Sequence, residues 1–386
     1  MSYKHLFSRA LDAAPGRLHL AAHSHHLWPD ASREGQLACW DDAARLADRK
    51  WDKVMGELWP AAQAEVSAEL GSGLPDAVVF AANTHDFLIR LAAACPRRAG
   101  QPLRVLTTDG EFHSARRQFA RWVEAGAITQ HSVAAEPFET LGERFLAAAK
   151  AEPFDLILVS QTLFGSGRRF DDLAPLAALA APAGPWVVVD GYHSFMANAA
   201  PLPAPLADRL FFLAGGYKYA MSGEGLGLMH APPGFGERPP ITGWYAEFED
   251  LTLPPGQVGY APDAMRFMGA TFDPSALYRF LAVRRMLASE GLTTAAISTH
   301  VAGLQAQLLD AIAGTPLAEA TLLNPLDSGP HARFLAFRSP RAAAWQQGLL
   351  AEDIVTDVRG EVLRIGLGLY HDADDIARFA KRVRTL

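Results

Sequence analysis

The feature that most constrains the fold is a series of short apolar runs, each four residues long, that recurs between residues 77 and 229. The runs are rich in β-branched and aromatic residues, and segments between the earlier ones, such as residues 84–95 and 113–123, have the apolar spacing of helices. A strand that is apolar at every position is buried on both faces, which is typical of a mainly parallel sheet between helices. The sequence therefore predicts an α/β core. The six runs are residues 77–80, 104–107, 156–159, 186–189, 210–213 and 226–229.

The pattern of elements changes beyond Pro274. Longer helices and a few short strands follow, which predicts a separate, smaller α+β domain over residues 274–386. We expect an N-terminal segment of residues 1–55 to join it, and the large α/β domain to span residues 56–273. The elements expected in the smaller domain are helices at residues 275–290, 294–312 and 372–383 and strands at residues 333–337 and 362–365.

Charge and cysteine content exclude several classes of protein. The 386 residues carry 35 Lys and Arg against 42 Asp and Glu, a net charge of −7. Without basic runs, the chain lacks what binding to nucleic acid or an anionic membrane requires. Cys39 and Cys95 are too few for a disulfide framework, and no long apolar segment or secretion signal is visible. We therefore expect a cytoplasmic protein with a small-molecule partner.

The sharpest local signal is a lysine at the end of an apolar run. Residues 210–229 read LFFLAGGYKYAMSGEGLGLM, so Tyr217 and Lys218 follow two glycines and precede a glycine-rich turn. Lysine is rarely buried unless it is paired or covalently engaged, although a solvated lysine on a turn is the simpler alternative. The glycines favour a Lys218 that is paired with or bonded to a ligand, because they allow a planar ligand to approach the backbone closely.

An acidic residue ends the preceding apolar run. In WVVVDGYHSF, Asp190 follows the run at residues 186–189, and His193 lies three residues later. Asp190 could simply cap a helix, but ligands of open α/β sheets bind outside the carboxyl ends of the strands, where both Asp190 and Lys218 fall. A lysine for a Schiff base and an anion that keeps a pyridine nitrogen protonated are what pyridoxal 5′-phosphate (PLP) requires.

Two further segments provide candidate contacts for such a cofactor. In AANTHDFLIRL, Asn83 and Thr84 open an amphipathic helix whose first amides, with the Thr84 hydroxyl, would bind a phosphate. The alternative is that Thr84 is only a helix cap. Phe112 follows the next apolar run and could lie over a ring, or could belong to the core.

These elements, in this order, resemble the class V branch of the fold-type I PLP-dependent enzymes, and within it kynureninase. The resemblance spans nearly the whole chain and is most specific in four segments: GYKYAMSGEG around Lys218, TGW at residues 242–244, TDVRGEVLRIGLGLYH at residues 356–371, and AHSHHLWP at residues 22–29. It implies a large PLP-binding domain built on a seven-stranded, mainly parallel sheet. The implied assembly is a homodimer with active sites at the interface.

The resemblance assigns roles to individual residues. It makes Lys218 the Schiff-base lysine, Asp190 the partner of the pyridinium nitrogen and Tyr217 a phosphate ligand and proton donor. Arg364, with Arg359 nearby, would grip the substrate carboxylate, and a bidentate guanidinium suits that task, although Arg364 could also be a surface ion-pair residue. The remaining implied contacts are cofactor contacts by Asn83, Thr84, Phe112, His193, Trp244 and the neighbouring subunit's Thr271, and substrate contacts by Ser24 and His25.

Several positions depart from the kynureninase pattern. Ala115 replaces an Asp, His113 replaces a proline, and ATFDP at residues 270–274 replaces SNPP. His25 and His26 replace Leu and Gly in the substrate loop. These changes leave the cofactor chemistry intact but bear on the substrate. The loop's three histidines have no carboxylate or cysteine at ligand spacing, so we expect no metal.

The predicted function is kynureninase-like hydrolysis of a Cβ–Cγ bond, which releases alanine. A class V aminotransferase is the alternative within the fold. A cysteine desulfurase is disfavoured, because Cys39 and Cys95 lie far in sequence from the C-terminal loop that would carry its thiol. A PLP-fold protein that binds without catalysis is the non-enzyme alternative.

Overall fold

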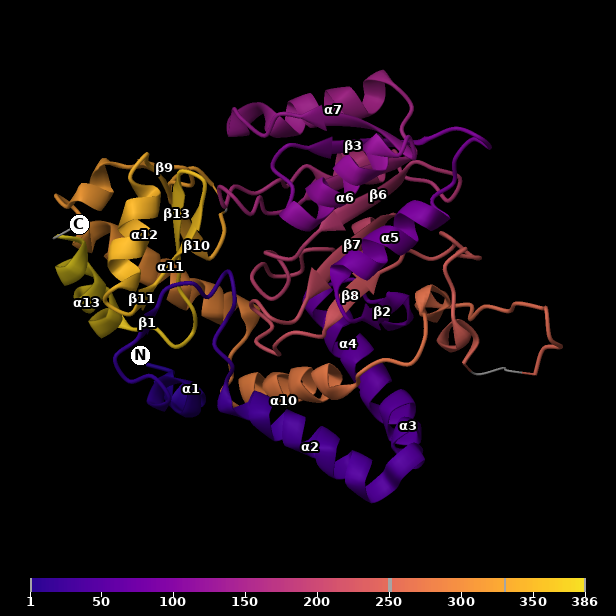
Figure 1. Ribbon diagram of the computed structural model, residues 1–386, viewed down its shortest axis with the longest axis horizontal. Helices are drawn as coiled ribbons and strands as arrows, with labels where there is room; N and C mark the ends of the chain where they lie inside the picture. The colour runs from indigo at the N-terminus through magenta and orange to yellow at the C-terminus, as the bar shows by residue number, and fades with distance from the viewer. Residues whose placement is uncertain (1, 249–251, 330, 385–386) are drawn as a thin grey trace.

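A seven-stranded sheet forms the centre of the larger lobe in the computed structural model, which describes residues 2–248, 252–329 and 331–384 (Figure 1). The strand order is β2-β8-β7-β6-β5-β3-β4. Every pairing is parallel except those of β8, which runs antiparallel to β2 and β7. The predicted α/β fold with a mainly parallel sheet is therefore confirmed. The strands are β2 Val78–Ala81, β3 Leu103–Thr108, β4 Ile128–Val133, β5 Leu156–Ser160, β6 Trp186–Asp190, β7 Leu210–Gly215 and β8 Gly227–His230.

Strand β4 was not predicted from the sequence. Its central residues, 129–132, are exposed and only Ile128 and Val133 are buried, so the strand contains no apolar run. It lies at the edge of the sheet, where one side of the strand faces solvent. Central strands β5, β6 and β7 are buried along nearly their whole length, which is why their apolar runs were recognisable.

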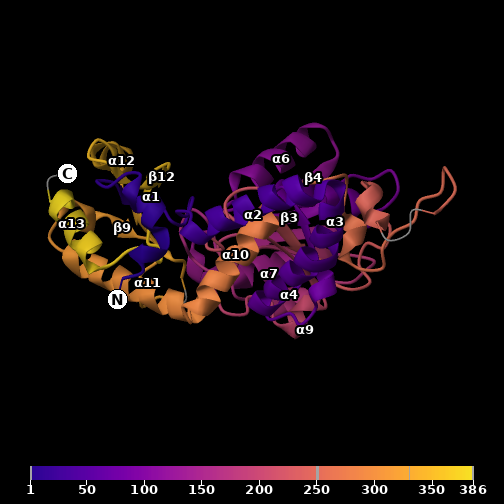
Figure 2. The ribbon, with the colours of Figure 1, turned by 90° about the horizontal axis from the view of Figure 1, so that it is seen from below.

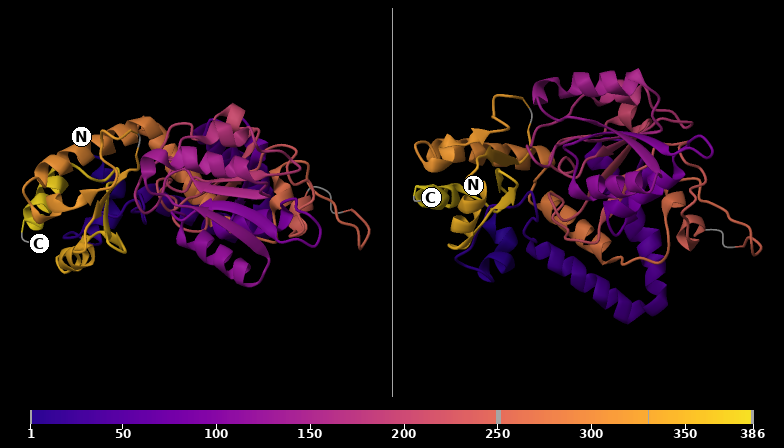
Figure 3. Two further views of the ribbon diagram at one scale, coloured as in Figure 1. Left: turned by 90° about the horizontal axis from the view of Figure 1, so that it is seen from above. Right: turned by 45° about the horizontal axis from the view of Figure 1, so that its top comes forward.

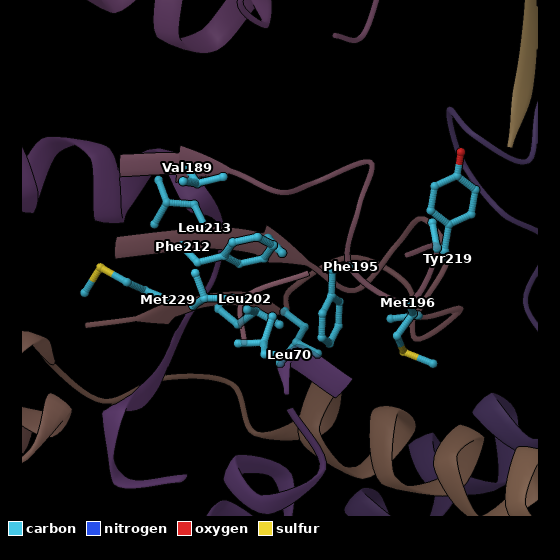
Figure 4. Packing of buried hydrophobic residues seen from close by; sticks show 14 of the residues in the cluster. Leu70, Val189, Phe195, Met196, Leu202, Phe212, Leu213, Tyr219 and Met229 are labelled. Carbon is cyan, nitrogen blue, oxygen red and sulfur yellow. The ribbon is translucent and has the colours of Figure 1, made fainter. Parts of the chain in front are cut away.

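Helices cover both faces of the sheet and close the core. Helices α6 and α7 lie on opposite faces (Figure 2). Leu70 and Leu202, whose backbones are hydrogen-bonded over 2.9 Å, pack beneath Phe212 of β7 (Figure 4). The helices of this lobe are α4 Trp59–Leu70, α5 Thr84–Ala94, α6 His113–Glu124, α7 Leu141–Ala151, α8 Leu173–Ala177 and α9 Ala204–Ala207.

The second lobe is built on a smaller, four-stranded antiparallel sheet in the order β12-β13-β10-β9 (Figure 3, left). Helix α13 begins with a capping box between Asp372 and Asp375, which satisfies amides of its first turn. The elements are β9 Thr321–Leu322, β10 Phe334–Arg338, β11 Ile354–Val355, β12 Asp357–Arg359, β13 Val362–Gly366, α11 Thr294–Ala311, α12 Ala342–Leu350 and α13 Ala373–Val383. Helix α10 (Ser275–Ser289) precedes them in the chain and packs near α4 of the larger lobe.

The N-terminal segment contacts both lobes. Strand β1 (Leu18–His19), after α1 (Ser8–Asp12), pairs in parallel with β11 in the small lobe. Helix α2 (Asp30–Leu46) then runs beside α10, and α3 (Lys50–Lys53) leads back toward α4 (Figures 1 and 2). The domain boundaries at residues 55 and 273 stay predictions. In the described part of the chain, no helix combines the length and the apolar character that crossing a bilayer requires.

Candidate active site

A cavity of about 210 Å³ opens at the carboxyl ends of the parallel strands. Strands β2, β3, β5, β6 and β7 all point toward this edge, so the residues that follow them converge. The cavity is lined by side chains that include Asn83, Thr84, Phe112, Ala115, Ser160, Phe164, Asp190, Tyr192, His193, Tyr217 and Lys218.

Lys218 lies buried in this cavity, with only 5% of its surface exposed. Its Nζ lies 2.9 Å from Nε2 of His193 and 4.8 Å from the ring centre of Tyr192. Burial lowers the pKa of the Lys218 amine to about 7, and the nearby Asp190 charge opposes part of this shift. Near neutral pH, a substantial fraction of Lys218 is therefore an uncharged, nucleophilic amine.

Asp190 ends β6 and is half-buried at the cavity wall. Its Oδ1 accepts a hydrogen bond from the backbone N–H of Tyr192 at 3.0 Å. The residues that follow, 191–200, form turns rather than a helix, so Asp190 caps no helix there. Burial raises the pKa of the Asp190 carboxyl, whereas the Tyr192 N–H and the Lys218 charge act in the opposite direction. A cationic ligand nitrogen beside Asp190 would keep the carboxylate ionised.

His193 holds Lys218 in place. Burial lowers the pKa of its imidazole well below the usual value, so the ring is neutral. Its Nε2 faces the Lys218 amine, and its buried Nδ1 has no hydrogen-bond partner. His193 therefore orients the amine without competing with it for a positive charge.

The N-terminus of α5 forms one end of the cavity. The cap is Asn83, whose side chain accepts a hydrogen bond from Asp86 N at 3.1 Å. Thr84 is the first helical residue rather than the cap, and its side chain lines the cavity. The first amides of an eleven-residue helix thus face the cavity beside a hydroxyl, an arrangement suited to an anion.

Two aromatic side chains form part of the cavity wall. Phe112 packs edge-to-face with Phe164, with ring centres 5.5 Å apart, and both line the cavity. Ala115, which replaces the Asp of the kynureninase pattern, lies in the same wall one helical turn after Phe112.

Several lining residues were not predicted from the sequence. Tyr192 lies two positions after Asp190, and Ser160 ends β5 directly after an apolar run, so their positions next to recognised signals could have revealed them. Phe164 reaches the cavity from a loop that has no recognisable pattern. Behind Ser160 lies Glu111, fully buried, which accepts hydrogen bonds from the hydroxyls of Ser160 at 2.5 Å and Thr108 at 2.6 Å.

Arg364 is buried in the small lobe and is already paired. It lies on β13, forms an ion pair with Asp357, and donates from Nη1 to the backbone oxygen of Phe164 at 2.5 Å. Because Phe164 lines the cavity, the guanidinium lies directly behind the wall. Arg359 is 40% exposed and pairs with the other Asp357 oxygen at 2.7 Å. Neither arginine lines the cavity itself.

The loop at residues 22–29 contacts Tyr217 of the cavity wall. His25 stacks on Tyr217, with ring centres 4.9 Å apart, and is exposed. Ser24 is half-buried, whereas His23 is fully buried, with no hydrogen bond at either ring nitrogen and with Nε2 3.8 Å from Asp357 Oδ2. The side chains of His23, His25 and His26 therefore do not share one environment. Among the described residues, no group of His, Cys, Asp and Glu side chains could hold a metal ion.

Trp244 and Thr271 lie away from the cavity. Trp244 Nε1 donates to Thr271 Oγ1 at 3.3 Å, and both residues are exposed. Neither belongs to the cavity wall. Within one chain they are therefore not brought together with Lys218. Their contact with a cofactor stays a prediction that depends on a second subunit.

Solved structures with the same architecture include several enzymes, whereas no protein-family model and no curated protein matches the chain. A cystine C–S lyase in complex with its product cysteine persulfide is 18% identical over 97% of this chain and 99% of that chain, with a TM-score of 0.79. A variant of the same lyase, with glycine covalently linked to its PLP cofactor, is 17% identical over the full length of both chains, with a TM-score of 0.80.

Cysteine desulfurases share the architecture as well. One from Escherichia coli is 16% identical over 99% of this chain and 96% of that chain, with a TM-score of 0.79. Another from Thermococcus onnurineus is 16% identical over 100% and 98%, with a TM-score of 0.77. The chain therefore has the fold-type I architecture that these desulfurases share with the PLP-containing C–S lyase.

Proposed function

We propose that this protein is a PLP-dependent enzyme that acts on an amino acid, with Lys218 as the site of covalent cofactor attachment. The observation that carries the proposal is the convergence of a buried low-pKa lysine and a carboxylate at neighbouring strand ends. Lys218 and Asp190 line the same cavity, which also receives the N-terminus of α5. Similarity to enzymes of the same fold supports the proposal.

The residues present fit this cofactor. PLP offers a flat ring, a phosphate, an aldehyde and a ring nitrogen, and the cavity has a counterpart for each. Phe112 provides an aromatic wall, Thr84 and the α5 amides provide anion donors, Lys218 provides the amine and Asp190 the anion. The backbone approaches closely at Gly227, where a Cβ atom would lie 2.5 Å from the backbone of Asn83.

Asp190, Lys218 and His193 would each have a separate role in the reaction. When bound, PLP withdraws electrons from the α-carbon of an attached amino acid. Asp190 would keep the ring nitrogen protonated by its negative charge. Lys218, once released, would accept the α-proton at Nζ, a role that suits an amine whose pKa is about 7. His193 would hold that amine through its 2.9 Å contact.

For the reaction itself, we propose kynureninase-like cleavage. Water would add its hydroxyl to the substrate γ-carbonyl carbon, the Cβ–Cγ bond would break, and Cβ would receive a proton, giving alanine and a carboxylic acid. The support is the resemblance in the segments around Lys218 and Arg364. We propose Arg364 as the substrate carboxylate ligand, because it lies directly behind Phe164 at the cavity wall.

A C–S lyase is a second candidate, favoured by the structural similarity to a cystine C–S lyase. That activity also acts at the β-carbon and needs the same lysine. A desulfurase that uses its own thiol is not supported, because neither Cys39 nor Cys95 lines the cavity and burial raises the pKa of both thiols. An aminotransferase stays an alternative, because it would use the same lysine, carboxylate and anion site of the cavity.

Product analysis separates these candidates. The purified protein loaded with PLP would be given kynurenine or 3-hydroxykynurenine without a keto acid, and alanine would be measured. We expect alanine release. Pyruvate and a persulfide from cystine would instead identify a C–S lyase, and turnover only with an added keto acid would identify an aminotransferase. Binding of PLP without any turnover would support the non-catalytic alternative.

A further inference from the structure

We propose that the hydroxyl of Tyr192 is a ligand of the cofactor phosphate, held in position by a pair of glycines on β7 and β8. This inference rests on the proposed function and deepens it, because it assigns the phosphate end of the cavity to a residue that the sequence motifs do not mark. Tyr192 lines the cavity together with Thr84 and Tyr217.

The first observation is that Tyr192 occupies the side-chain space of residue 215. A Cβ atom built on Gly215 would lie 2.0 Å from the Tyr192 Oη and 2.4 Å from its Cζ. Any side chain at this position would displace the phenol. The absence of a side chain at residue 215 therefore allows a hydroxyl from the neighbouring β6 loop to reach the end of β7.

The second observation places that hydroxyl beside the N-terminus of α5. Gly215 is paired directly with Gly227 in the antiparallel ladder of β7 and β8. A Cβ atom on Gly227 would lie 2.5 Å from the backbone carbon of Asn83. Residues directly opposite each other in such a ladder direct their side chains to the same face, with Cβ atoms about 5 Å apart.

The two glycines thus position two groups on one face of the sheet. The Tyr192 hydroxyl lies at the Gly215 position, and the start of α5 lies at the Gly227 position. Because a hydrogen bond to a phosphate oxygen spans about 2.8 Å, donors roughly 5 Å apart can each reach a different oxygen of one phosphate. Because paired residues of a ladder have Cβ positions about 5 Å apart, the Tyr192 hydroxyl and the start of α5 lie on one face close enough to contact one phosphate.

The chemistry of Tyr192 suits this role. Burial raises the pKa of its phenol well above the usual value, so the hydroxyl keeps its proton and can donate. Its ring lies beside that of Tyr217, with ring centres 5.0 Å apart, and the two phenol groups interact. The phenol O–H has two orientations in the plane of the ring, so the hydroxyl can donate to an anion without a change of side-chain position.

A structural role must be distinguished from phosphate binding. The Tyr192 ring also lies 4.8 Å from the Lys218 amine, so the ring could simply position that lysine. The Tyr192→Phe variant keeps the ring and removes only the hydroxyl. Comparing PLP with pyridoxal, which has the aldehyde but no phosphate, then isolates the phosphate contribution.

The experiment is a titration of the cofactor-free protein with PLP and with pyridoxal, followed by absorbance. For Tyr192→Phe we expect the Kd of PLP to rise about 10- to 100-fold, the loss of one hydrogen bond to a charged group, while the Kd of pyridoxal stays unchanged. Inorganic phosphate should compete with PLP less effectively in the variant. Tyr260→Phe is the matched control, because the Tyr260 hydroxyl donates to Pro239 O outside the cavity; both dissociation constants should stay unchanged.

A compensating variant tests the geometry. Tyr192→Ala should weaken PLP binding, and adding Gly215→Ser should restore part of it, since the serine hydroxyl would reach the space that the phenol vacates. Equal weakening of PLP and pyridoxal in Tyr192→Phe, or no change in either, would overturn the phosphate role. If the wild-type protein bound neither aldehyde, the proposed function itself would fail, and this inference with it.

Discussion

The two sides of the proposed active site differ in how their charged groups are satisfied. At the sheet edge, Lys218 and Asp190 face a cavity. Burial lowers the pKa of the Lys218 amine and raises the pKa of the Asp190 carboxyl. In the small lobe, Arg364 is already paired with Asp357 and with a backbone oxygen. The cofactor side is thus organised in advance, whereas a substrate carboxylate must share Arg364 with partners it already has.

The largest effect is expected from removing the charge on the sheet side. Asp190→Asn keeps the shape but cannot hold a ring nitrogen in its protonated form, so kcat should fall by about 100-fold or more. PLP should still bind, because Lys218 and the α5 N-terminus are untouched. Steady-state kinetics and a cofactor titration check this. Asp171→Asn, at an exposed ion pair with Arg169, is the control.

On the small-lobe side, Arg364→Lys tests carboxylate binding. A lysine cannot satisfy Asp357 and a substrate carboxylate together, so KM should rise about 10- to 100-fold with a smaller change in kcat. Arg359→Lys should change KM much less, because Arg359 is 40% exposed, whereas Arg364 is buried and hydrogen-bonded to Phe164 of the cavity wall. An equal rise in KM for both variants would contradict the distinction between the two arginines.

A steric change tests the close approach at the sheet edge. Gly227→Ala places a Cβ atom 2.5–2.8 Å from the backbone of Asn83, which neither side can relieve easily. We expect a loss of about 1–3 kcal/mol in the free energy of unfolding, measured with urea. Gly303→Ala in α11 meets no atom within 4 Å and should stabilise the protein slightly.

The last effect is visible only as a change with pH and concerns the carboxyl behind Ser160. Burial raises the pKa of Glu111 to about 7, partly opposed by hydrogen bonds from Ser160 and Thr108. Its protonated form therefore favours the folded state, and this contribution is lost as pH rises from about 4.5 to about 7. Glu111→Gln should gain stability relative to wild type over that range, by up to about 3 kcal/mol, because each unit of pKa difference corresponds to about 1.4 kcal/mol. A pH-independent difference in urea midpoint would refute this.

Much of the fold could be predicted because its buried strands are apolar along their length. Strand β4 could not, since its central residues are exposed. The convergence of Asp190 and Lys218 was predictable from the rule that parallel strands share a carboxyl edge. The pairing of Arg364 with Asp357 and the placement of Tyr192 against Gly215 depend on contacts between distant segments and between cross-strand neighbours, which no local pattern specifies.

The central claim is that Lys218 carries the cofactor. The wild-type protein would be incubated with PLP, reduced with borohydride and digested, and the modified peptide identified by mass spectrometry. We predict one pyridoxyl group on Lys218, visible absorbance before reduction, and loss of both in Lys218→Ala. Attachment at another lysine, or visible absorbance that persists in Lys218→Ala, would contradict the account.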